Sequence, residues 1–425
     1  MLEPIATRDA WAVMSAIARD LSTAFEARPR KPGDARQFSL AGGDAGIATF
    51  FHGLATRPEF PEAASMRDAY LGRAVAALSD VPMDSSLYGG FCGVAWAIDR
   101  ISRASTGETL VEPGALDSID RVLADYVERR PDCDLDIVSG AIGIGVYLLN
   151  RLPRDEARRG LTAIVESISE RAERSGAYVT WHTPSSRLHG DDCATYPEGR
   201  YDLGVAHGVP GVIAFLSQCA RASIATDTAR ELLAGAVPWL LDAAAPRSAG
   251  FRFPCWIAPV GPAQPTRLAW CYGDLGVSLA LLQAADASSR ADWRAIAHEL
   301  ASEAARRTSE NAGIIDAGLC HGTACAAHLF RHWFRATSDA RFLDASRYWY
   351  RQTLSMRREG LGIGGYRSVI RDVDLNDVWI DDPELLNGAA GIGLSLLGAA
   401  TDGDTDWDRF LLLPPPGDRL AGERA

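Results

Sequence analysis

The sequence predicts an all-α fold: an α/α toroid, a double ring of about seven inner and seven outer helices with irregular insertions. Three observations predict it. A glycine pattern recurs seven times, an apolar helical run follows each occurrence, and charged amphipathic segments lie between the runs. Recurrence at a spacing of tens of residues is the mark of architectures built from repeated helical or strand units.

The repeated pattern is Gly-x-x-Gly followed by small and apolar residues. The first glycines of the seven turns are Gly43, Gly90, Gly140, Gly208, Gly273, Gly322 and Gly388. The shorter spacings between them fit two helices with their connections, and the longer ones add a loop or an inserted element. The sixth turn has Cys325 in place of the second glycine. That cysteine is expected either to crowd the start of its helix or to leave a thiol near the residues of the turn.

Each glycine turn is expected to open a buried helix, because glycine lets backbones approach where a side chain would not fit. The runs that follow have almost no polar face, so burial on all sides is expected. The segments between them are amphipathic and charged: Ala64–Leu78, Leu116–Arg129, Arg154–Arg174 and Asp292–Arg307. Alternation of the two kinds favours an inner ring within an outer ring. A linear solenoid is the alternative, but its repeats are usually more uniform in length, and unrelated helices in a bundle would not repeat seven times.

We expect one domain over residues 1–413 and a disordered, proline-rich tail over residues 414–425. Three connections rich in aromatic residues, proline and glycine do not resemble helices: Tyr178–Tyr201, Phe251–Pro265 and Leu361–Val373. A small inserted domain around residues 175–205 is one interpretation of the first. Long connections on the glycine side of the ring are natural places for a functional site.

Composition sets limits on the function. Hydrophobic residues make up 47% and charged residues 23% of the 425 residues, as in ordinary soluble proteins. The formal net charge of −12 argues against a nucleic-acid partner, which needs a basic surface. No signal-peptide pattern and no apolar run of membrane-spanning length is present, so a cytoplasmic location is expected. Eight cysteines are too sparse for a secreted disulfide scaffold.

Two cysteines and a histidine precede the fifth and sixth glycines, as Cys271 and as the pair Cys320 and His321. Zn²⁺ accepts thiolate and imidazole ligands, and three protein ligands leave a position for water or substrate. A closed structural site with His207 as fourth ligand is the alternative. A single buried cysteine is more often a small core residue than a ligand. We keep that interpretation for Cys92, Cys133, Cys219 and Cys325.

Groups suited to proton transfer precede the third and fourth glycines, namely Asp136 and His207, and Arg267 and Tyr272 flank Cys271. If all glycine turns lie at one end of the ring, these side chains converge with the cysteines. The structural alternative is that Asp136 and Arg267 cap or pair helices. His328 and His332, one helical turn apart in a charged stretch, are interpreted as surface or groove residues.

At these residues the sequence resembles the lanthipeptide (lantibiotic) cyclases, the LanC and LanC-like family. The motifs are Trp270-Cys271-Tyr272-Gly273, Cys320-His321-Gly322 and Ala206-His207-Gly208, and the resemblance extends from the first glycine turn to the seventh. It implies an α/α toroid and one zinc ion held by Cys271, Cys320 and His321. It also implies acid/base roles for His207 and Asp136, with Arg267 and Tyr272 beside the metal.

The resemblance further implies the reaction: a precursor-peptide cysteine adds to dehydroalanine or dehydrobutyrine and closes a lanthionine or methyllanthionine thioether ring. A free thiol has a pKa of about 8.5, and zinc coordination deprotonates it. We expect His207 to donate the proton, Asp136 to orient it or assist as a base, and Arg267 to stabilise the enolate. The expected partners are a dehydrated precursor peptide (leader plus core), a separate dehydratase and an exporter, since no dehydratase segment precedes the repeats. The expected location in the cytoplasm is compatible with membership of a membrane-associated biosynthetic complex.

Two other functions are alternatives to peptide cyclisation. A LanC-like zinc protein that binds a peptide or a small thiol such as glutathione without cyclising it would carry the same motifs. A terpene or prenyl-transfer enzyme would share the architecture, but the sequence lacks an Asp-Asp-x-x-Asp cluster on a helix, and Asp381-Asp382 precedes a proline in a loop.

Overall fold

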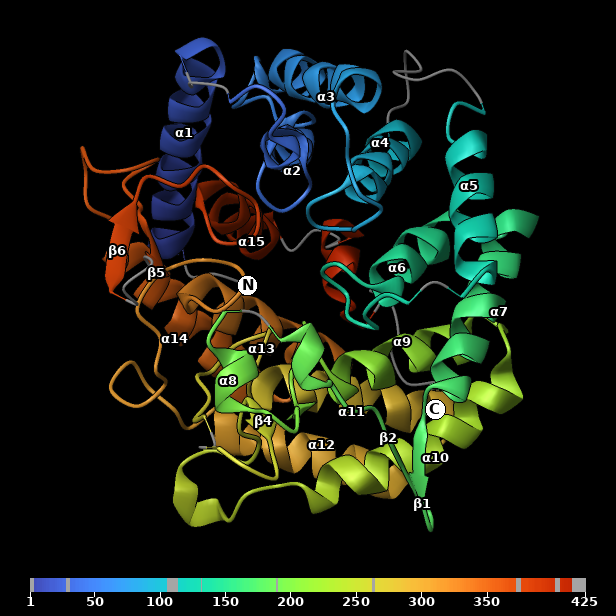
Figure 1. Cartoon of the computed structure of the whole chain (residues 1–425). Helices are drawn as coiled ribbons and strands as arrows, with labels where there is room; N and C mark the ends of the chain where they lie inside the picture. The colour runs from blue at the N-terminus through green and yellow to red at the C-terminus, as the bar shows by residue number, and fades with distance from the viewer. Residues whose placement is uncertain are drawn as a thin grey trace, which may run out of the picture. The chain divides into compact units, whose positions relative to one another are not determined.

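The computed structural model describes residues 4–27, 31–104, 114–130, 132–188, 190–261, 264–371, 376–401 and 406–414. The chain divides into two compact units. Their helices and strands are labelled in Figure 1. Unit 1 comprises residues 1–116, 314–407 and 416–425, and unit 2 comprises residues 117–313 and 408–415. Of the expected disordered tail, residues 415–425 lie outside the described residues. The expectation of a single domain over residues 1–413 stays a prediction.

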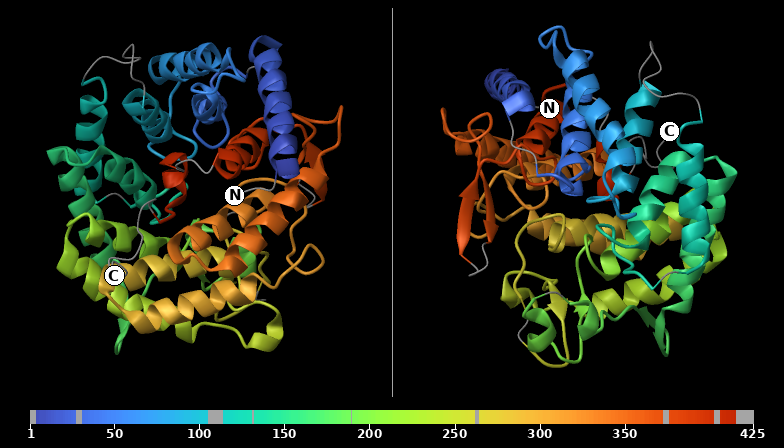
Figure 2. Two further views of the ribbon diagram at one scale, coloured as in Figure 1. Left: turned by 180° about the vertical axis from the view of Figure 1, so that it is seen from behind. Right: turned by 45° about the horizontal axis from the view of Figure 1, so that its top comes forward.

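Unit 1 contains four of the helices that follow a glycine turn and three that cover them. The first group is α2 (Asp44–Leu54), α4 (Phe91–Ala104), α13 (Thr323–Thr337) and α15 (Ala389–Thr401), and the second is α1 (Pro4–Ala27), α3 (Ala63–Asp80) and α14 (Ala340–Met356). Helix α2 packs against α3, α4 and α15, and α13 packs against α14 and α15 (Figure 2). Two 3-10 turns, η1 (Ala35–Phe38) and η4 (Asp406–Leu411), complete the helical elements, and η4 crosses the boundary between the units.

Unit 2 contains the other three glycine-turn helices and their covering helices. The first group is α6 (Ala141–Arg151), α9 (Val209–Arg221) and α11 (Asp274–Ser288), and the second is α5 (Asp117–Glu128), α7 (Asp155–Glu170), α10 (Thr226–Asp242) and α12 (Ala291–Ala304). Helix α9 packs against α6, α10 and α11, and α7 packs against α5 and α6. The connections hold a short α8 (Asp192–Thr195) and the 3-10 turns η2 (Ser185–Arg187) and η3 (Arg247–Ala249).

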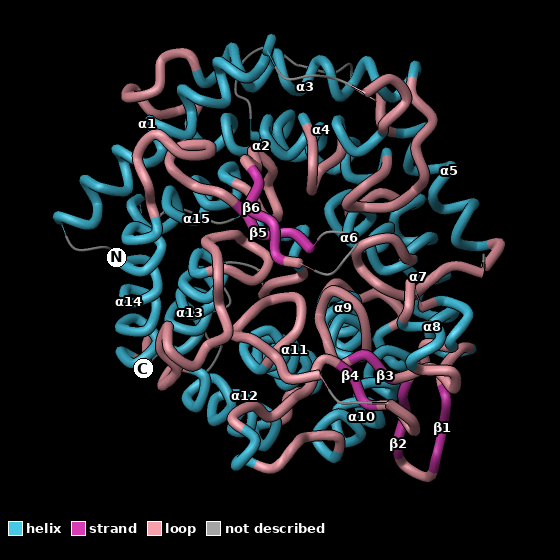
Figure 3. Tube along the Cα trace, turned by 60° about the vertical axis from the view of Figure 1, so that its left-hand side comes forward, coloured by secondary structure: helices cyan, strands magenta, loops and turns pink. Residues whose placement is uncertain are grey.

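Three two-stranded antiparallel sheets lie within or next to the aromatic-rich connections (Figure 3). In unit 2, β1 (Glu173–Ser175) pairs with β2 (Tyr178–Thr180), and β3 (Tyr201–Asp202) pairs with β4 (Trp256–Ile257). In unit 1, β5 (Ser368–Arg371) pairs with β6 (Asp377–Ile380). Connections expected to be irregular are therefore partly ordered by short strand pairs. Val373 lies outside the described residues.

All seven predicted glycine-turn helices are present, each beginning immediately after the first glycine of its turn. Their residues are mostly buried, as their apolar composition predicts. The four predicted amphipathic segments correspond to α3, α5, α7 and α12, with ends shifted by up to four residues. Among the described residues, no helix has both the length and the apolar character needed to cross a membrane.

The second glycine of a turn is required by a close backbone approach. A Cβ at Gly93 would lie 1.9 Å from the carbonyl oxygen of Leu87, and one at Gly391 would lie 1.9 Å from that of Leu385. No side chain fits at such a distance. In the sixth turn Cys325 is accommodated with 1% exposure, and its Sγ lies 3.2 Å from the carbonyl oxygen of Cys320. The cysteine therefore leaves a thiol beside the proposed ligand residues.

Candidate active site

Backbone hydrogen bonds tie consecutive glycine turns together within each unit. In unit 2 the third turn is bonded to the fourth through Ile137 N–H and Ala206 O (3.3 Å), and the fourth to the fifth through Ala206 N–H and Cys271 O (3.3 Å). In unit 1 the sixth turn is bonded to the seventh through Cys320 N–H and Leu386 O (2.9 Å). Residues far apart in sequence are thereby fixed next to one another, as the repeat predicts.

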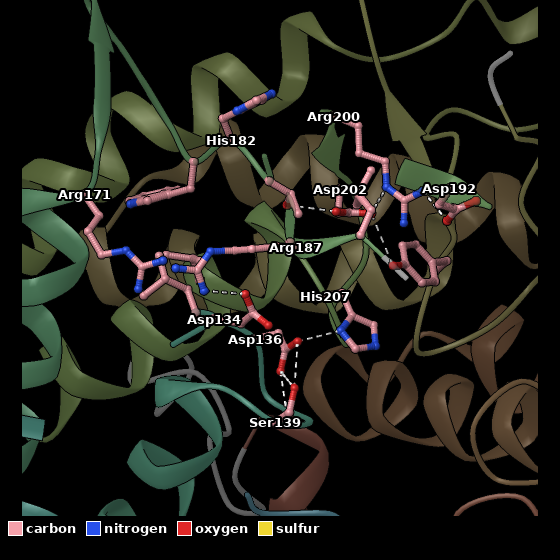
Figure 4. Close-up of a pocket in the computed structure, with 17 residues that line it drawn as sticks. Asp134, Asp136, Ser139, Arg171, His182, Arg187, Asp192, Arg200, Asp202 and His207 are labelled. Carbon is pink, nitrogen blue, oxygen red and sulfur yellow. Dashed lines mark hydrogen bonds and ion pairs between the residues drawn. The ribbon is translucent and has the colours of Figure 1, made fainter. Parts of the chain in front are cut away.

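A pocket of about 360 Å³ opens beside the third and fourth turns of unit 2 (Figure 4). Of the predicted catalytic residues, the acid/base candidates Asp136 and His207 line it, and so does Tyr272. Figure 4 shows the Asp136 carboxylate pointing towards the His207 imidazole. Other charged side chains in the pocket wall are Asp134, Arg171, Arg187, Asp192, Arg200 and Asp202.

Asp136 is held as a carboxylate at the start of α6. It accepts hydrogen bonds from the backbone N–H groups of Ser139 (2.7 Å) and Gly140 (3.0 Å) and lies 2.8 Å from His207 Nδ1. Burial by itself raises the pKa of Asp136, but the bond and the charge of His207 and the two backbone bonds outweigh it. The pKa of Asp136 is therefore lowered. Both backbone bonds are made to the turn that precedes α6, and not to N–H groups of the helix itself, and they coexist with the contact to His207.

His207 lies between Asp136 and the side chain of Tyr272. Burial lowers the pKa of the imidazole. The hydrogen bond and charge of Asp136, and then the charge of Asp202, raise the pKa by more than burial lowers it. The net effect is a raised pKa for His207. With Nδ1 bonded to Asp136, the other ring nitrogen, Nε2, is free of that bond. The side chain is 42% exposed, so the ring remains accessible from the pocket.

Tyr272 is anchored by a carboxylate that the sequence did not single out, Asp202 on β3. Tyr272 OH lies 3.4 Å from Asp202 Oδ1, and the ring lies 6.2 Å from that of His207, centroid to centroid. Backbone pairing of Gly204 with Tyr272 fixes the position. Burial and the charge of Asp202 raise the pKa of Tyr272 well above its usual value, so its hydroxyl keeps its proton.

Asp202 itself is 4% exposed and bonded on both oxygens. Its Oδ1 accepts from Arg200 Nε (3.0 Å) and its Oδ2 from Thr183 Oγ1 (3.0 Å). Burial, the largest influence, raises the pKa of Asp202, and the opposing charge of Arg200 only partly offsets this. The Arg200 guanidinium also lies 3.8 Å from the ring centroid of Trp256, a cation–π contact.

Cys271 and Arg267 belong to the loop that precedes α11 and are both partly exposed. Neither is among the residues that line the pocket, although Cys271 is the immediate neighbour of Tyr272. Cys255, which precedes β4, is a further thiol in their electrostatic range: burial first, and then the charge of Cys271, raise its pKa to about 11, while Arg267 opposes the shift. The sequence had given Cys255 no role.

In unit 1, Cys320 and His321 stand immediately before Gly322 and α13. Cys320 is 8% exposed, His321 is partly exposed, and a ligand atom of one lies within 4.8 Å of a ligand atom of the other. Cys320 and Cys271 occupy equivalent positions, two residues before the glycine of their turns. The chain thus contains groups of the kind that bind Zn²⁺.

The interpretation of His328 and His332 as surface or groove residues was wrong. They are 1% and 5% exposed, with ring centroids 4.9 Å apart. Both lie on α13, which is buried on nearly all sides, and the neighbouring Arg331 is fully buried as well. Charged residues within one stretch suggested exposure, but the helix packs among the others of unit 1, and His328 contacts the ring of Trp407.

The residues that sequence reasoning missed are Asp202 and Arg200, together with Arg171 and Arg187 in the pocket wall. They lie outside the repeated turns. Arg187 and Arg200 belong to the connection Tyr178–Tyr201, Asp202 follows it, and Arg171 is near the end of the amphipathic segment Arg154–Arg174. The aromatic-rich character of Tyr178–Tyr201 was a signal for the connection, but it did not identify these side chains.

Comparison with known proteins gives a family match and a structural match. The model of a family described as "Lanthionine synthetase C-like protein" matches residues 34–412. A structure described as "Nisin cyclase" is similar with a TM-score of 0.74 and 20% sequence identity, covering 93% of this chain and 96% of that one. At this identity the likeness shows the fold, and it confirms the predicted α/α-toroid class.

A structure described as a sugar epimerase from ruminal bacterium aligns over 92% of this chain and 99% of its own. Its TM-score of 0.44 and identity of 10% are too low to carry any argument. No curated protein matches the sequence.

Proposed function

Because the chain belongs to the lanthionine synthetase C-like family, we propose that it is a zinc-dependent peptide cyclase. The substrate is a precursor peptide that contains dehydroalanine or dehydrobutyrine. A cysteine sulfur of the peptide forms a bond to the alkene β-carbon, and a proton is delivered to the α-carbon. No atom is gained or lost, so the thioether-bridged product has the mass of the substrate.

The observation that carries the proposal is the His207–Asp136 pair in the wall of a pocket. The thiol addition places negative charge on the carbonyl next to the α-carbon, and the reaction ends only when that carbon is protonated. An acid must therefore hold a proton near neutral pH and release it into the pocket. The raised pKa of His207 favours the protonated ring, and the ring is accessible from the pocket, so His207 is the group best suited to this role.

The geometry favours one division of roles between the two residues. Asp136 accepts bonds from Ser139 and Gly140 and has a lowered pKa, so it is poorly suited to taking up a proton. Its role is to fix the imidazole through Nδ1 and to stabilise the imidazolium form. His207 then delivers the proton from Nε2. This arrangement follows the rule that a general acid is oriented by a second, hydrogen-bonded group.

Tyr272 and Arg267 are proposed to assist without transferring the proton. The Tyr272 hydroxyl stays protonated and borders the same pocket, so it is able to donate a hydrogen bond to the developing oxyanion. Arg267 lies on the loop that leads to Cys271, and its positive charge suits the same oxyanion. Asp202 and Arg200 hold the Tyr272 side of the pocket in place.

Cys271, Cys320 and His321 are the proposed zinc ligands. Two thiols and an imidazole are the donors that zinc prefers, and three protein ligands leave room for a substrate thiol. The closeness of Cys320 to His321 and the equivalent position of Cys271 in its own turn support the assignment. When bound, zinc would supply the acidification of the substrate thiol, which is otherwise mostly protonated near pH 7.

The test is incubation of the protein with a dehydrated, cysteine-containing precursor peptide. We expect loss of the peptide's reaction with a thiol-alkylating reagent at unchanged mass. His207→Asn is expected to lower the rate about 100-fold or more, whereas His298→Asn, on the covering helix α12, leaves it unchanged. Wild-type protein that binds zinc and the peptide but consumes no thiol would support instead the alternative of a binding protein for a peptide or a small thiol.

A dehydratase and an exporter are the proposed partners.

A further inference from the structure

A second pocket, also of about 360 Å³, lies in unit 1 and uses none of the residues discussed so far. It is lined by Ile315, Met356, Arg358, Leu361, Tyr366 and Trp379, among others. We refer to it as the Trp379 pocket. Its walls come from the loop before α13, the end of α14, the loop that follows α14 and the β5–β6 strand pair. The labels α13, α14, β5 and β6 locate these segments in Figures 1 and 3.

The rim of the Trp379 pocket is apolar and exposed to solvent. Ile315 is 43% exposed, Leu361 is 53% exposed and Trp379 is 46% exposed. Bulky apolar side chains scattered singly over a surface need no explanation, but three that border one hollow form a patch of the kind that marks binding sites. A concave site of a few hundred Å³ with apolar walls is also typical of ligand pockets.

The polar groups at the pocket leave a positive charge available. Asp316, 2% exposed, accepts hydrogen bonds from the backbone N–H groups of Gly318 (3.1 Å) and Val369 (3.3 Å) and so serves the local structure. Arg358 donates to the carbonyl oxygens of Ser355 (2.9 Å) and Arg357 (3.1 Å). Within the part of the chain that the structure describes, no carboxylate pairs with Arg358.

A second cation, Arg367, also lines the pocket. It pairs with Asp381 at 2.9 Å, but both partners are exposed, with 41% and 60% of their side-chain surface accessible. Exposed pairs of this kind are weak and exchange partners readily. The rim thus offers one unpaired and one loosely paired guanidinium, on a protein whose formal net charge is −12. Local positive charge on an acidic protein favours a ligand with carboxylates at this position.

The shape of the strand pair favours a peptide over a lipid surface. Val369 is opposite Trp379 and Ile370 is opposite Val378, so the two pairs project from opposite faces of the β5–β6 sheet. Ile370 and Val378 are 44% and 37% exposed. A membrane would be contacted by apolar side chains on one face. Here one face borders a hollow instead, which is suited to a single inserted side chain.

We propose that the Trp379 pocket binds an acidic peptide segment of a partner polypeptide. One bulky apolar side chain of the segment fills the hollow against Leu361 and Trp379. A carboxylate within about two residues of it pairs with Arg358, where a bidentate contact adds both strength and orientation. The site is separate from the His207 pocket, and binding requires no reaction, so the inference stands independently of the proposed function.

The test starts from the full chain and a displayed library of random decapeptides. The tightest binder is synthesised with a fluorescein label and titrated by fluorescence anisotropy. We expect it to contain Asp or Glu within two positions of an aromatic or branched apolar residue. Trp379→Ala and Arg358→Glu are each expected to weaken binding at least tenfold, whereas Arg306→Glu, an exposed arginine after α12, and Val122→Ser leave it unchanged.

A charge exchange separates recognition from misfolding. Replacing the acidic residue of the peptide by Lys is expected to restore binding to Arg358→Glu. Failure to select such peptides, or equal binding to wild type and both pocket variants, overturns the proposal. It is also overturned if the two variants abolish binding to phosphatidylserine vesicles or self-association in sedimentation, while peptide affinity stays the same.

Discussion

His207 and Asp136 are joined by a 2.8 Å contact between Nδ1 and Oδ2, although 71 residues separate them in the sequence. Two further links hold the pair in place. The backbones of their turns are bonded through Ile137 and Ala206, and Asp136 accepts hydrogen bonds from Ser139 and Gly140 in the turn before α6. Rigid support of this kind is what precise positioning of a catalytic group requires.

The first prediction concerns the charge of Asp136. Asp136→Asn keeps the shape of the side chain but removes the negative charge that raises the pKa of His207. We expect the pKa of His207 to fall in the variant, as measured by NMR titration of the imidazole. Cyclisation should slow at least tenfold near neutral pH, because less of the imidazole is protonated. An unchanged His207 pKa would show that the charge of Asp136 is not the main cause of the raised pKa.

The second prediction concerns stability and pH. The folded pKa of His207 is raised, so its contribution to stability is complete below the unfolded value of 6.5 and is lost as the pH rises through the folded value. The folded pKa of Asp136 is lowered, so its contribution is present above 3.8 and is lost as the pH falls through the folded value. The difference in unfolding free energy between wild type and His207→Gln should therefore shrink from pH 5.5 to pH 9 in urea denaturation. A difference that grows over this range would contradict the assigned ion pair.

The third prediction concerns Arg200, whose side chain is 10% exposed and pairs with the buried Asp202. Arg200→Met leaves that carboxylate buried with its main partner removed, which is expected to cost about 3 kcal/mol at pH 8. The folded pKa of Asp202 is already raised and rises further in the variant. The loss should be smaller at pH 5, where more of the carboxyl group is protonated than at pH 8. As a control, Arg174→Met breaks an exposed pair with Glu231 and should have little effect at either pH.

The fourth prediction tests the glycine turns. Gly93→Ala places a methyl group 1.9 Å from the carbonyl oxygen of Leu87, so the start of α4 must shift, at an expected cost of about 2 kcal/mol or more. Gly72 on α3 has nothing within 4 Å of its Cβ position. Gly72→Ala should therefore stabilise the protein by about 0.5 to 1 kcal/mol through helix propensity. Thermal unfolding of the two variants gives opposite signs if the close approach is the reason for the glycine.

The fifth prediction tests the metal assignment. Cys320→Ala removes a proposed ligand, and the purified variant is expected to contain much less than one equivalent of zinc by elemental analysis. Cys92→Ala, a buried cysteine of the second glycine turn, is the matched control and should keep the wild-type content. A full equivalent retained by Cys320→Ala would exclude that residue as a ligand.

Much of the fold followed from local sequence. Glycine spacing and the apolar runs predicted the seven buried helices, whose starts coincide with the observed ones. Both signals are local, because a close backbone approach needs glycine and an apolar run needs burial whatever surrounds it. The same pattern predicted that residues before the glycines converge, and this agrees with the bonded turns of Ala206 and Cys271.

The wrong or missing predictions concern side chains whose burial and contacts depend on residues distant in the sequence. His328 and His332 looked polar enough for a surface, yet packing against other helices buries them. Asp202 gave no signal, because its importance arises from Arg200, Thr183 and Tyr272. These residues are brought together by backbone bridges between Thr183 and Arg200 and between Gly204 and Tyr272. Amino-acid composition alone does not determine which of these backbone segments pair.

By itself, then, the sequence determined the repeat, the class of fold and the identity of the groups able to bind zinc or move a proton. The tertiary structure alone decided how His207 and Asp136 share their hydrogen bond, which carboxylate anchors Tyr272, and where the Trp379 pocket opens. The physical reason is that residue chemistry and helix periodicity are properties of short segments. A pKa, an ion pair or a cavity depends on distances between segments, which exist only once the chain has packed.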